Sequence, residues 1–360
     1  MKRLAIAFAL ALAGFAGLDL EAARSLDFQA RALDEAMPAN LRRSTVFSPI
    51  SFEIDAAIFG GSMDALARAA VAETIGTLGD FANAYQLAMT NVTVARAFVL
   101  PHLNLARCEH RRRLSKSFAT QVCGHRPQGA AEAYLKAAME GEMEDFTVGE
   151  LSVDRRYQFF DLLSVRVEPS EPFARRQDGD FHCADGTVAK MAFVEGLLNC
   201  SVRRYGVFSL VRIPLVGGEE LFLAMPDEGV PLADIRRDLD RFRLANAFSS
   251  FRAVGDAKLA HGRRQVLLPE IDISSETSLR KLMTAFKIPT SGFEQFHPNL
   301  LPAALVQRVR VRTVTRIEES PGAKSAPNGE ALRFDRPFMF FVVRQSSNLL
   351  KVAGQFTGIR

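Results

Sequence analysis

The feature that most constrains the fold is a polar segment near the C-terminus that is flanked by strand-forming residues. Residues 309–317 alternate apolar side chains with basic or hydroxyl ones, which predicts a strand with one buried face. Residues 334–343 and 349–356 are apolar and rich in Phe and Val, which predicts two buried strands. The intervening residues 318–331 contain two prolines and two glycines and lack apolar periodicity. We therefore predict an exposed loop whose two ends are fixed in sheet.

The rest of the chain predicts one domain of mixed α and β structure, with helices mostly in the first half. Helical spacing or composition predicts helices over residues 25–37, 50–60 and 129–145. Ser48-Pro49 gives the second of these a capped start. Strands are predicted over 91–100 and 157–167, and antiparallel sheet with a few helices from about residue 180. The 360 residues would allow two domains, but no repeat or linker divides them.

Composition excludes several classes of protein. With 48% hydrophobic and 24% charged residues, the chain is neither a disordered tail nor a multi-span membrane protein. The net charge is only +4, from 45 basic and 41 acidic residues, so we expect no nucleic-acid partner. The basic run Arg111-Arg112-Arg113 could hold a polyanion such as heparin, but no aromatic side chains interleave with it. We expect a solvated helix face there.

The N-terminus resembles an export signal. Lys2 and Arg3 precede an apolar run that reaches about Leu18, which is too short for a comfortable membrane span. We predict a signal peptide over residues 1–22, a secreted, extracellular protein, and a domain over residues 25–360. A buried first helix of the fold is the alternative.

Cysteine and acidic residues carry no recognisable chemistry in the sequence. Cys108, Cys123, Cys183 and Cys200 form no CxxC pair, so they permit three full disulfide pairings or free thiols. The six histidines lack metal-ligand spacing, and nucleotide, phosphate and hydrolase motifs are absent. Residues 140–145 hold four acidic side chains, which we interpret as a solvated helix end. We expect no enzyme activity, no cofactor and no metal.

The order of the pieces resembles a serpin. The most specific match is the C-terminal block Leu332 to Val342, which contains Arg336-Pro337-Phe338. Further matched blocks are Phe47-Ser48-Pro49-Ile50-Ser51, Pro172-Phe173 before Asp185-Gly186-Thr187, Val216 to Leu221 before Met225-Pro226, and Leu268-Pro269-Glu270. Together they cover the chain from about residue 25 to 360.

This resemblance implies an α+β fold, a single serpin-like domain with helices packed on large, mainly antiparallel sheets and an exposed reactive loop. In inhibitory serpins a protease cleaves the loop, becomes acylated and is distorted as the loop inserts into the sheet as a new strand. The implied bait bond is Lys324–Ser325, a basic–small pair that suits trypsin-like enzymes, with Arg333 as a second candidate. The partner would be a serine protease of the host or of the organism itself, and we expect a monomer.

The hinge before the loop departs from the family pattern of two glutamates, a glycine and a threonine. Glu318 and Glu319 fit, but Ser320 replaces the glycine and Pro321 follows it. Proline has no amide to donate and is not tolerated in a central strand. From Glu319 to Lys324 the chain reaches only about 17 Å at roughly 3.3 Å per residue. A non-inhibitory serpin-fold binding protein is therefore the alternative function.

The polar cluster beneath the sheet opening also departs from the pattern. Serpins use two serines, an asparagine and a histidine there. Ser48 and Ser51 match, Asp161 aligns with the asparagine, and Arg310 or Val311 with the histidine. The chain also resembles serpins of large DNA viruses, which act on host inflammation or cell death. The similarity lies in its divergence from the family pattern, its short loop and its high arginine content.

Overall fold

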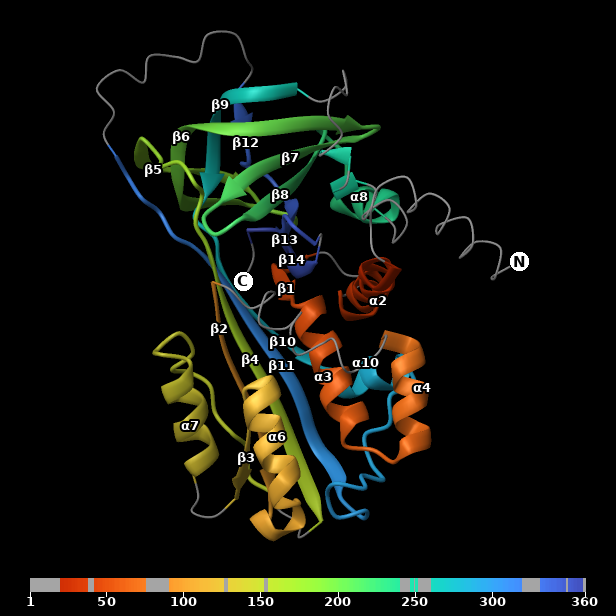
Figure 1. Cartoon of the computed structure of the whole chain (residues 1–360). Helices are drawn as coiled ribbons and strands as arrows, with labels where there is room; N and C mark the ends of the chain where they lie inside the picture. The colour runs from red at the N-terminus through yellow and green to blue at the C-terminus, as the bar shows by residue number, and fades with distance from the viewer. Residues whose placement is uncertain are drawn as a thin grey trace.

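Two β-sheets and a group of helices make up the protein (Figure 1). The structure is a computed structural model that describes residues 20–37, 42–75, 91–125, 129–151, 155–239, 247–248, 250–251, 260–318, 331–347 and 349–358. Within these ranges the helices are α2(Leu20–Ala36), α3(Pro49–Gly61), α4(Ala65–Ile75), η1(Leu103–Leu105), α6(Cys108–Phe118), α7(Ala130–Ala138), α8(Leu232–Asp238) and α10(Leu279–Ala285).

A five-stranded sheet forms the long axis of the molecule, as Figure 1 shows. Its strands lie in the order β10(Asp272–Ser278), β11(Leu301–Thr313), β4(Arg156–Val167), β2(Val92–Leu100) and β3(Thr120–Gly124). The pairs β4–β11 and β2–β3 are parallel, whereas β10–β11 and β2–β4 are antiparallel. The sheet is therefore mixed, less uniformly antiparallel than expected.

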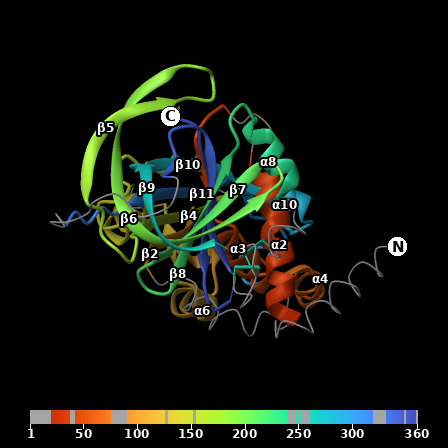
Figure 2. The same ribbon diagram turned by 90° about the horizontal axis from the view of Figure 1, so that it is seen from above.

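The second sheet is built largely from the C-terminal half of the chain. Its strands, in sheet order, are β1(Thr45–Phe47), β14(Leu350–Phe356), β13(Phe338–Arg344), β8(Glu219–Pro226), β7(Phe208–Leu215), β6(Val188–Tyr205), β9(Ala260–Pro269) and β12(Leu332–Arg333). The additional strand β5(Arg175–His182) pairs with β6 and forms an outer edge (Figure 2). The predicted strands 334–343 and 349–356 thus lie side by side as β13 and β14.

Helix α3 is buried over its whole length. Ser48 caps it, since its Oγ accepts a hydrogen bond from the amide of Ser51 at 3.3 Å, and Pro49 occupies the first turn. Every residue from Pro49 to Gly61 is buried, so the helix needs no polar face. This confirms the buried helix predicted over residues 50–60.

Strand β2 sends alternate side chains to two cores. Phe98 and Leu100 pack in the main core with the residues of α3, whereas Ala97 and Val99 pack against α7 on the opposite face. The five-stranded sheet is thus covered on both faces. Arg96 is the exception in this apolar strand, because it is fully buried and charged.

Helix α7 is shorter than the sequence predicts. It ends at Ala138, because Glu140 and Gly141 both adopt positive φ angles, 51° and 81°, that no α-helix contains. The interpretation of residues 140–145 as a solvated helix end was wrong for Glu142. Its side chain is 4% exposed and lies against the sheet.

All four cysteines are free thiols in this structure. Cys108 is exposed at the start of α6, and Cys123 is partly buried. Cys183 is buried just after β5, and Cys200 is buried in β6. The sequence left free thiols and disulfide pairings open, and the structure has the former.

Candidate functional site

The junction between β4 and β11 is where the predicted loop leaves the sheet. The two strands are parallel and in register from Gln158 and Ala304 to Val167 and Thr313. Because they are parallel, their C-terminal ends lie at the same end of the sheet (Figure 1). The chain continues from Thr313 toward the loop at that end.

The first residues after β11 remain attached to the segment that follows β4. The amide of Val314 donates to the carbonyl of Val167 at 2.9 Å, and Phe173 and Arg316 pair through a 2.8 Å bond. Arg316 also donates to the carbonyl of Pro169 at 2.9 Å. The predicted hinge residue Glu318 is tied in the same way, since its amide donates to the carbonyl of Phe173 at 3.0 Å.

The other residues of the predicted hinge and bait lie outside the described residues. These are Glu319, Ser320, Pro321, Lys324 and Ser325. Arg333, the second bait candidate, lies in β12 opposite Leu267 of β9, where its backbone is part of a sheet. The assignment of Lys324–Ser325 as the bait bond stays a prediction.

A buried polar cluster beneath the middle of the β4–β11 pairing brings Ser48, Ser51 and Asp161 together. The Ser51 hydroxyl donates to Asp161 Oδ2 at 2.7 Å, and the Ser48 hydroxyl donates to the carbonyl of Lys351 in β14 at 2.7 Å. All three side chains are buried. The cluster therefore joins α3, β4 and β14.

Gln307 of β11 completes this cluster, in place of the predicted Arg310 or Val311. Its Nε2 donates to Asp161 Oδ2 at 3.0 Å, and its Oε1 accepts from the amide of Ser48 at 3.0 Å. Asp161 and Gln307 are also register partners on neighbouring strands. One amide side chain thus links β11 to both β4 and the start of α3.

The phase of β11 explains why the assignment to Arg310 or Val311 was wrong. Side chains alternate between the two faces of a strand, so Arg310 points away from the cluster and pairs instead with Asp272. Val311 lies on the correct face, but four residues along the strand and in a different apolar core. A polar residue at a buried position of the alternation was the sequence signal for Gln307.

Three charged side chains lie under the same middle part of the sheet. Arg96 Nε lies 2.8 Å from Asp161 Oδ1 and 3.3 Å from Asp55 Oδ1, and all three side chains are fully buried. Burial raises the pKa of Asp55 well above its usual range, and the adjacent Asp161 raises it further, while Arg96 opposes both effects. A protonated Asp55 leaves Arg96 and Asp161 as one balanced ion pair.

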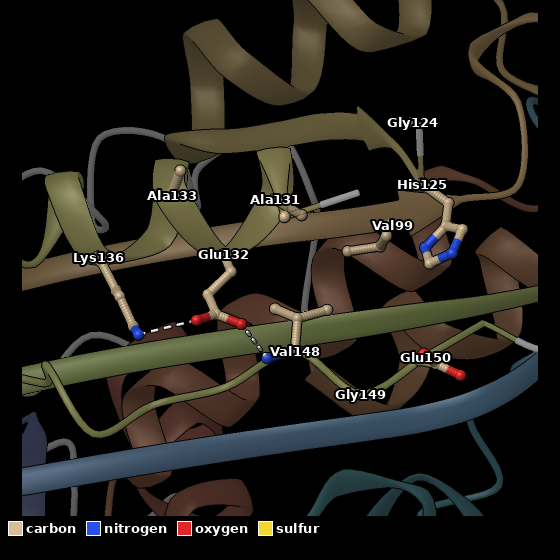
Figure 3. Close-up of a pocket in the computed structure, with 11 residues that line it drawn as sticks. Val99, Gly124, His125, Ala131, Glu132, Ala133, Lys136, Val148, Gly149 and Glu150 are labelled. Carbon is tan, nitrogen blue, oxygen red and sulfur yellow. Dashed lines mark hydrogen bonds and ion pairs between the residues drawn. The ribbon is translucent and has the colours of Figure 1, made fainter. Parts of the chain in front are cut away.

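A cavity of about 420 Å³ lies between α7 and the edge of the five-stranded sheet (Figure 3). Glu132 lines this cavity. Its carboxylate accepts a hydrogen bond from the amide of Val148 at 3.0 Å and pairs with Lys136 at 2.8 Å, as the dashed lines mark. The lining also includes Val99, a branched apolar side chain. The cavity lies beside the buried contacts that Ala131 and Leu135 of α7 make with the sheet.

Two other kinds of feature are absent from the described part of the chain. Among those residues, histidine, cysteine and carboxylate side chains form no group that could hold a metal ion. No helix there is both long and apolar enough to cross a membrane. The junction, together with the loop predicted over residues 318–331, is the candidate functional site.

Several solved structures share this architecture. Tengpin, a thermophilic serpin in its native state, is 12% identical with a TM-score of 0.78, over 94% of this chain and 95% of that chain. SRPN18 from Anopheles gambiae is 15% identical with a TM-score of 0.77, over 93% and 97%. Native protease nexin-1 with heparin is 16% identical with a TM-score of 0.72, over 94% and 98%. The TM-scores, over more than 90% of each chain, establish the fold.

Sequence comparison establishes the family. No curated protein matches the chain. Residues 130–359, well over half of the chain, match the family model for serpins, described as serine protease inhibitors. They include β4, β11 and the strands that flank the loop. With the two sheets and the polar cluster in this arrangement, the chain belongs to the serpin family.

Proposed function

We propose that the protein is a secreted inhibitor of trypsin-like serine proteases, with Lys324–Ser325 as its bait bond. In this reaction the protease's serine forms an ester with the Lys324 carbonyl, and the amine of Ser325 leaves. The freed N-terminal part of the loop then inserts as a strand and distorts the attached protease. The protein acts as a trap and not as an enzyme.

The direct parallel pairing of β4 with β11 is the observation that carries this proposal. A segment that leaves the end of β11 and turns back runs antiparallel to it. On one side of β11 such a pairing already exists with β10. On the other side, insertion next to β4 would replace one parallel pairing with two antiparallel ones, which are slightly more stable per residue.

The length of the chain after β11 supports insertion more than the sequence alone suggested. The sheet pairing of β11 ends at Thr313, eleven residues before Lys324. An extended segment of that length reaches about 36 Å at roughly 3.3 Å per residue, against about 40 Å for the twelve residues of β4. If residues 314–318 detach from residues 167–173, the segment before Lys324 is therefore long enough to form most of a strand beside β4.

The competing proposal is a serpin-fold protein that binds a partner without trapping proteases. Pro321 favours it, because a proline cannot donate a hydrogen bond within a central strand. The bonds that hold Val314, Arg316 and Glu318 to residues 167–173 favour it as well.

Trypsin distinguishes the two functions. We expect the full chain, mixed with trypsin, to give a complex that survives SDS on a denaturing gel, and K324A to give none. Cleavage after Lys324 without a complex would sink the trapping mechanism and support the binding protein. Cleavage followed by insertion should also raise the melting temperature of the chain, because a strand is added to the sheet. An unchanged melting temperature would support the second function.

Secretion is part of the proposal. The cleavable signal peptide over residues 1–22 is the proposed route, with the serpin domain over residues 25–360. The N-terminal sequence of protein recovered from the medium of expressing cells checks it. A chain that stays inside the cell with its first residues intact contradicts it.

Heparin binding is a separate question, which the nexin-1 complex raises. Helix α6 exposes Arg112, Arg113 and Lys116, whereas Arg111 is partly buried and bonds to Cys108. We expect weak retention on a heparin column and little change in R112E/K116E, because three exposed charges give only a modest, salt-screened attraction. Strong retention that this double variant abolishes would contradict the solvated-face interpretation.

A further inference from the structure

Glu142 joins β4 and β11 across the outer face of the five-stranded sheet. Its Oε1 lies 2.7 Å from Arg166 Nη2 of β4 and 2.7 Å from Arg312 Nη2 of β11. Ser164 of β4 donates to the other carboxylate oxygen at 3.2 Å. Arg310 of β11 donates to the backbone carbonyl of Glu142 at 2.7 Å. One residue after α7 thus binds two side chains from each strand.

The four bound side chains come from neighbouring positions of the same pairing. Arg166 is the register partner of Arg312, and Ser164 is the partner of Arg310. Like charges directly opposite each other on adjacent strands repel. The Glu142 carboxylate pairs with both guanidinium groups, and its attraction to each of them offsets the repulsion between them.

Burial strengthens the arrangement. Glu142 is 4% exposed, whereas Arg166 and Arg312 are 51% and 38% exposed. Burial alone would raise the pKa of Glu142, but the hydrogen bond from Arg166 and the charges of Arg312 and Arg166 hold it below its usual value. The carboxylate is therefore charged at neutral pH and attracts both arginines.

The position of these contacts matters more than their number. Arg312 precedes Thr313, the last residue of β11, and Arg166 precedes Val167, the last residue of β4. This is the end at which the chain leaves for the loop. A strand that came between β4 and β11 there would move them apart by about 4.8 Å. Glu142 Oε1 would then lose at least one of its two arginines.

We propose that Glu142 is a positioning residue that clamps β4 to β11 at this end and sets the rate at which the sheet opens for a strand. The role in protease trapping rests on the function proposed above, whereas the clamp itself is a property of the sheet. The remaining contacts of this segment support it, because Asp145 pairs with Arg308, also on β11.

Hydrogen–deuterium exchange of the full chain at neutral pH tests the clamp. In E142Q we expect the amides of residues 162–167 and 308–313 to exchange about tenfold faster than in the wild type, since local opening controls exchange. E144Q is the matched control, because Glu144 is exposed and the substitution removes the same charge two residues away. R312Q, at a partly exposed position, should reproduce the effect of E142Q if the latter folds poorly.

The possible outcomes distinguish the proposed role of Glu142 from the proposed inhibitory function. Unchanged exchange in both E142Q and R312Q would overturn the clamp, as would faster exchange spread equally over β13 and β14. Faster local exchange, in a chain that forms no complex with trypsin, would keep the clamp and remove the inhibitory function. If trypsin is trapped, E142Q should form the complex several-fold faster than E144Q. Equal rates would limit the clamp to sheet stability and overturn its role in trapping.

Discussion

R96L is expected to lower the free energy of unfolding by about 3–5 kcal/mol, the usual effect of removing one member of a buried ion pair. Arg96, Asp55 and Asp161 are all fully buried, so water cannot replace the lost guanidinium group. The variant leaves the Asp161 carboxyl without its cationic partner beneath the sheet. Urea unfolding of the variant and the wild type measures the difference.

A second substitution separates charge from packing in this experiment. In R96L/D161N the buried charge is gone, while the asparagine oxygen still accepts from Ser51 and Gln307, so we expect a substantial part of the loss to be recovered. K190L is the surface control. Lys190 is 78% exposed in its pair with Asp180, and its loss should change stability by no more than about 0.5 kcal/mol. Equal losses in R96L and R96L/D161N would show that packing, and not charge, dominates.

E53Q is expected to remove a large part of the pH dependence of stability. Glu53 of α3 is fully buried, and burial raises its pKa to about 8 against the hydrogen bonds from Gln29 and Ser25. Between pH 4.5 and 8 the folded chain therefore keeps a proton that the unfolded chain releases. Stability from this group is complete below pH 4.5 and falls as the pH rises, by on the order of 5 kcal/mol in total.

Urea unfolding at several values between pH 5 and 8 measures this effect. The advantage of E53Q over the wild type should grow steadily across the range, because glutamine stays neutral in both states. E35Q, at an exposed position of α2, is the control for the loss of one carboxyl. Parallel profiles for E53Q and the wild type would show that Glu53 does not hold a proton in the folded chain.

Local patterns predicted the elements but not the partners of their charged side chains. The capped start at Ser48-Pro49 and the apolar run after it were sufficient for α3. The period-two alternation was sufficient for β11, although the strand begins earlier, at Leu301, and ends at Thr313. These features are local, because each depends on residues within one element.

The polar contacts of the site depend on tertiary structure. Glu142 resembles any member of an acidic run until β4 and β11 bring Arg166 and Arg312 beside it. Arg96 carried a signal that was available in the sequence, since it is the one charged residue of the apolar strand Val92–Leu100. A charge in such a strand requires a buried partner. The identity of that partner, Asp161, depends on the antiparallel register of β2 and β4.

The free thiols allow the opening of the second sheet to be followed over time by alkylation. The thiolate attacks an alkylating reagent, so the exposed Cys108 is labelled in the folded protein, whereas burial raises the pKa of the Cys200 thiol to about 11 and keeps this thiol unreactive. Cys200 lies in β6 opposite Gly262 of β9, so it gains reactivity when those strands part. The extent of labelling at Cys200, read from the mass of the peptide that contains it, then records how often β6 and β9 separate.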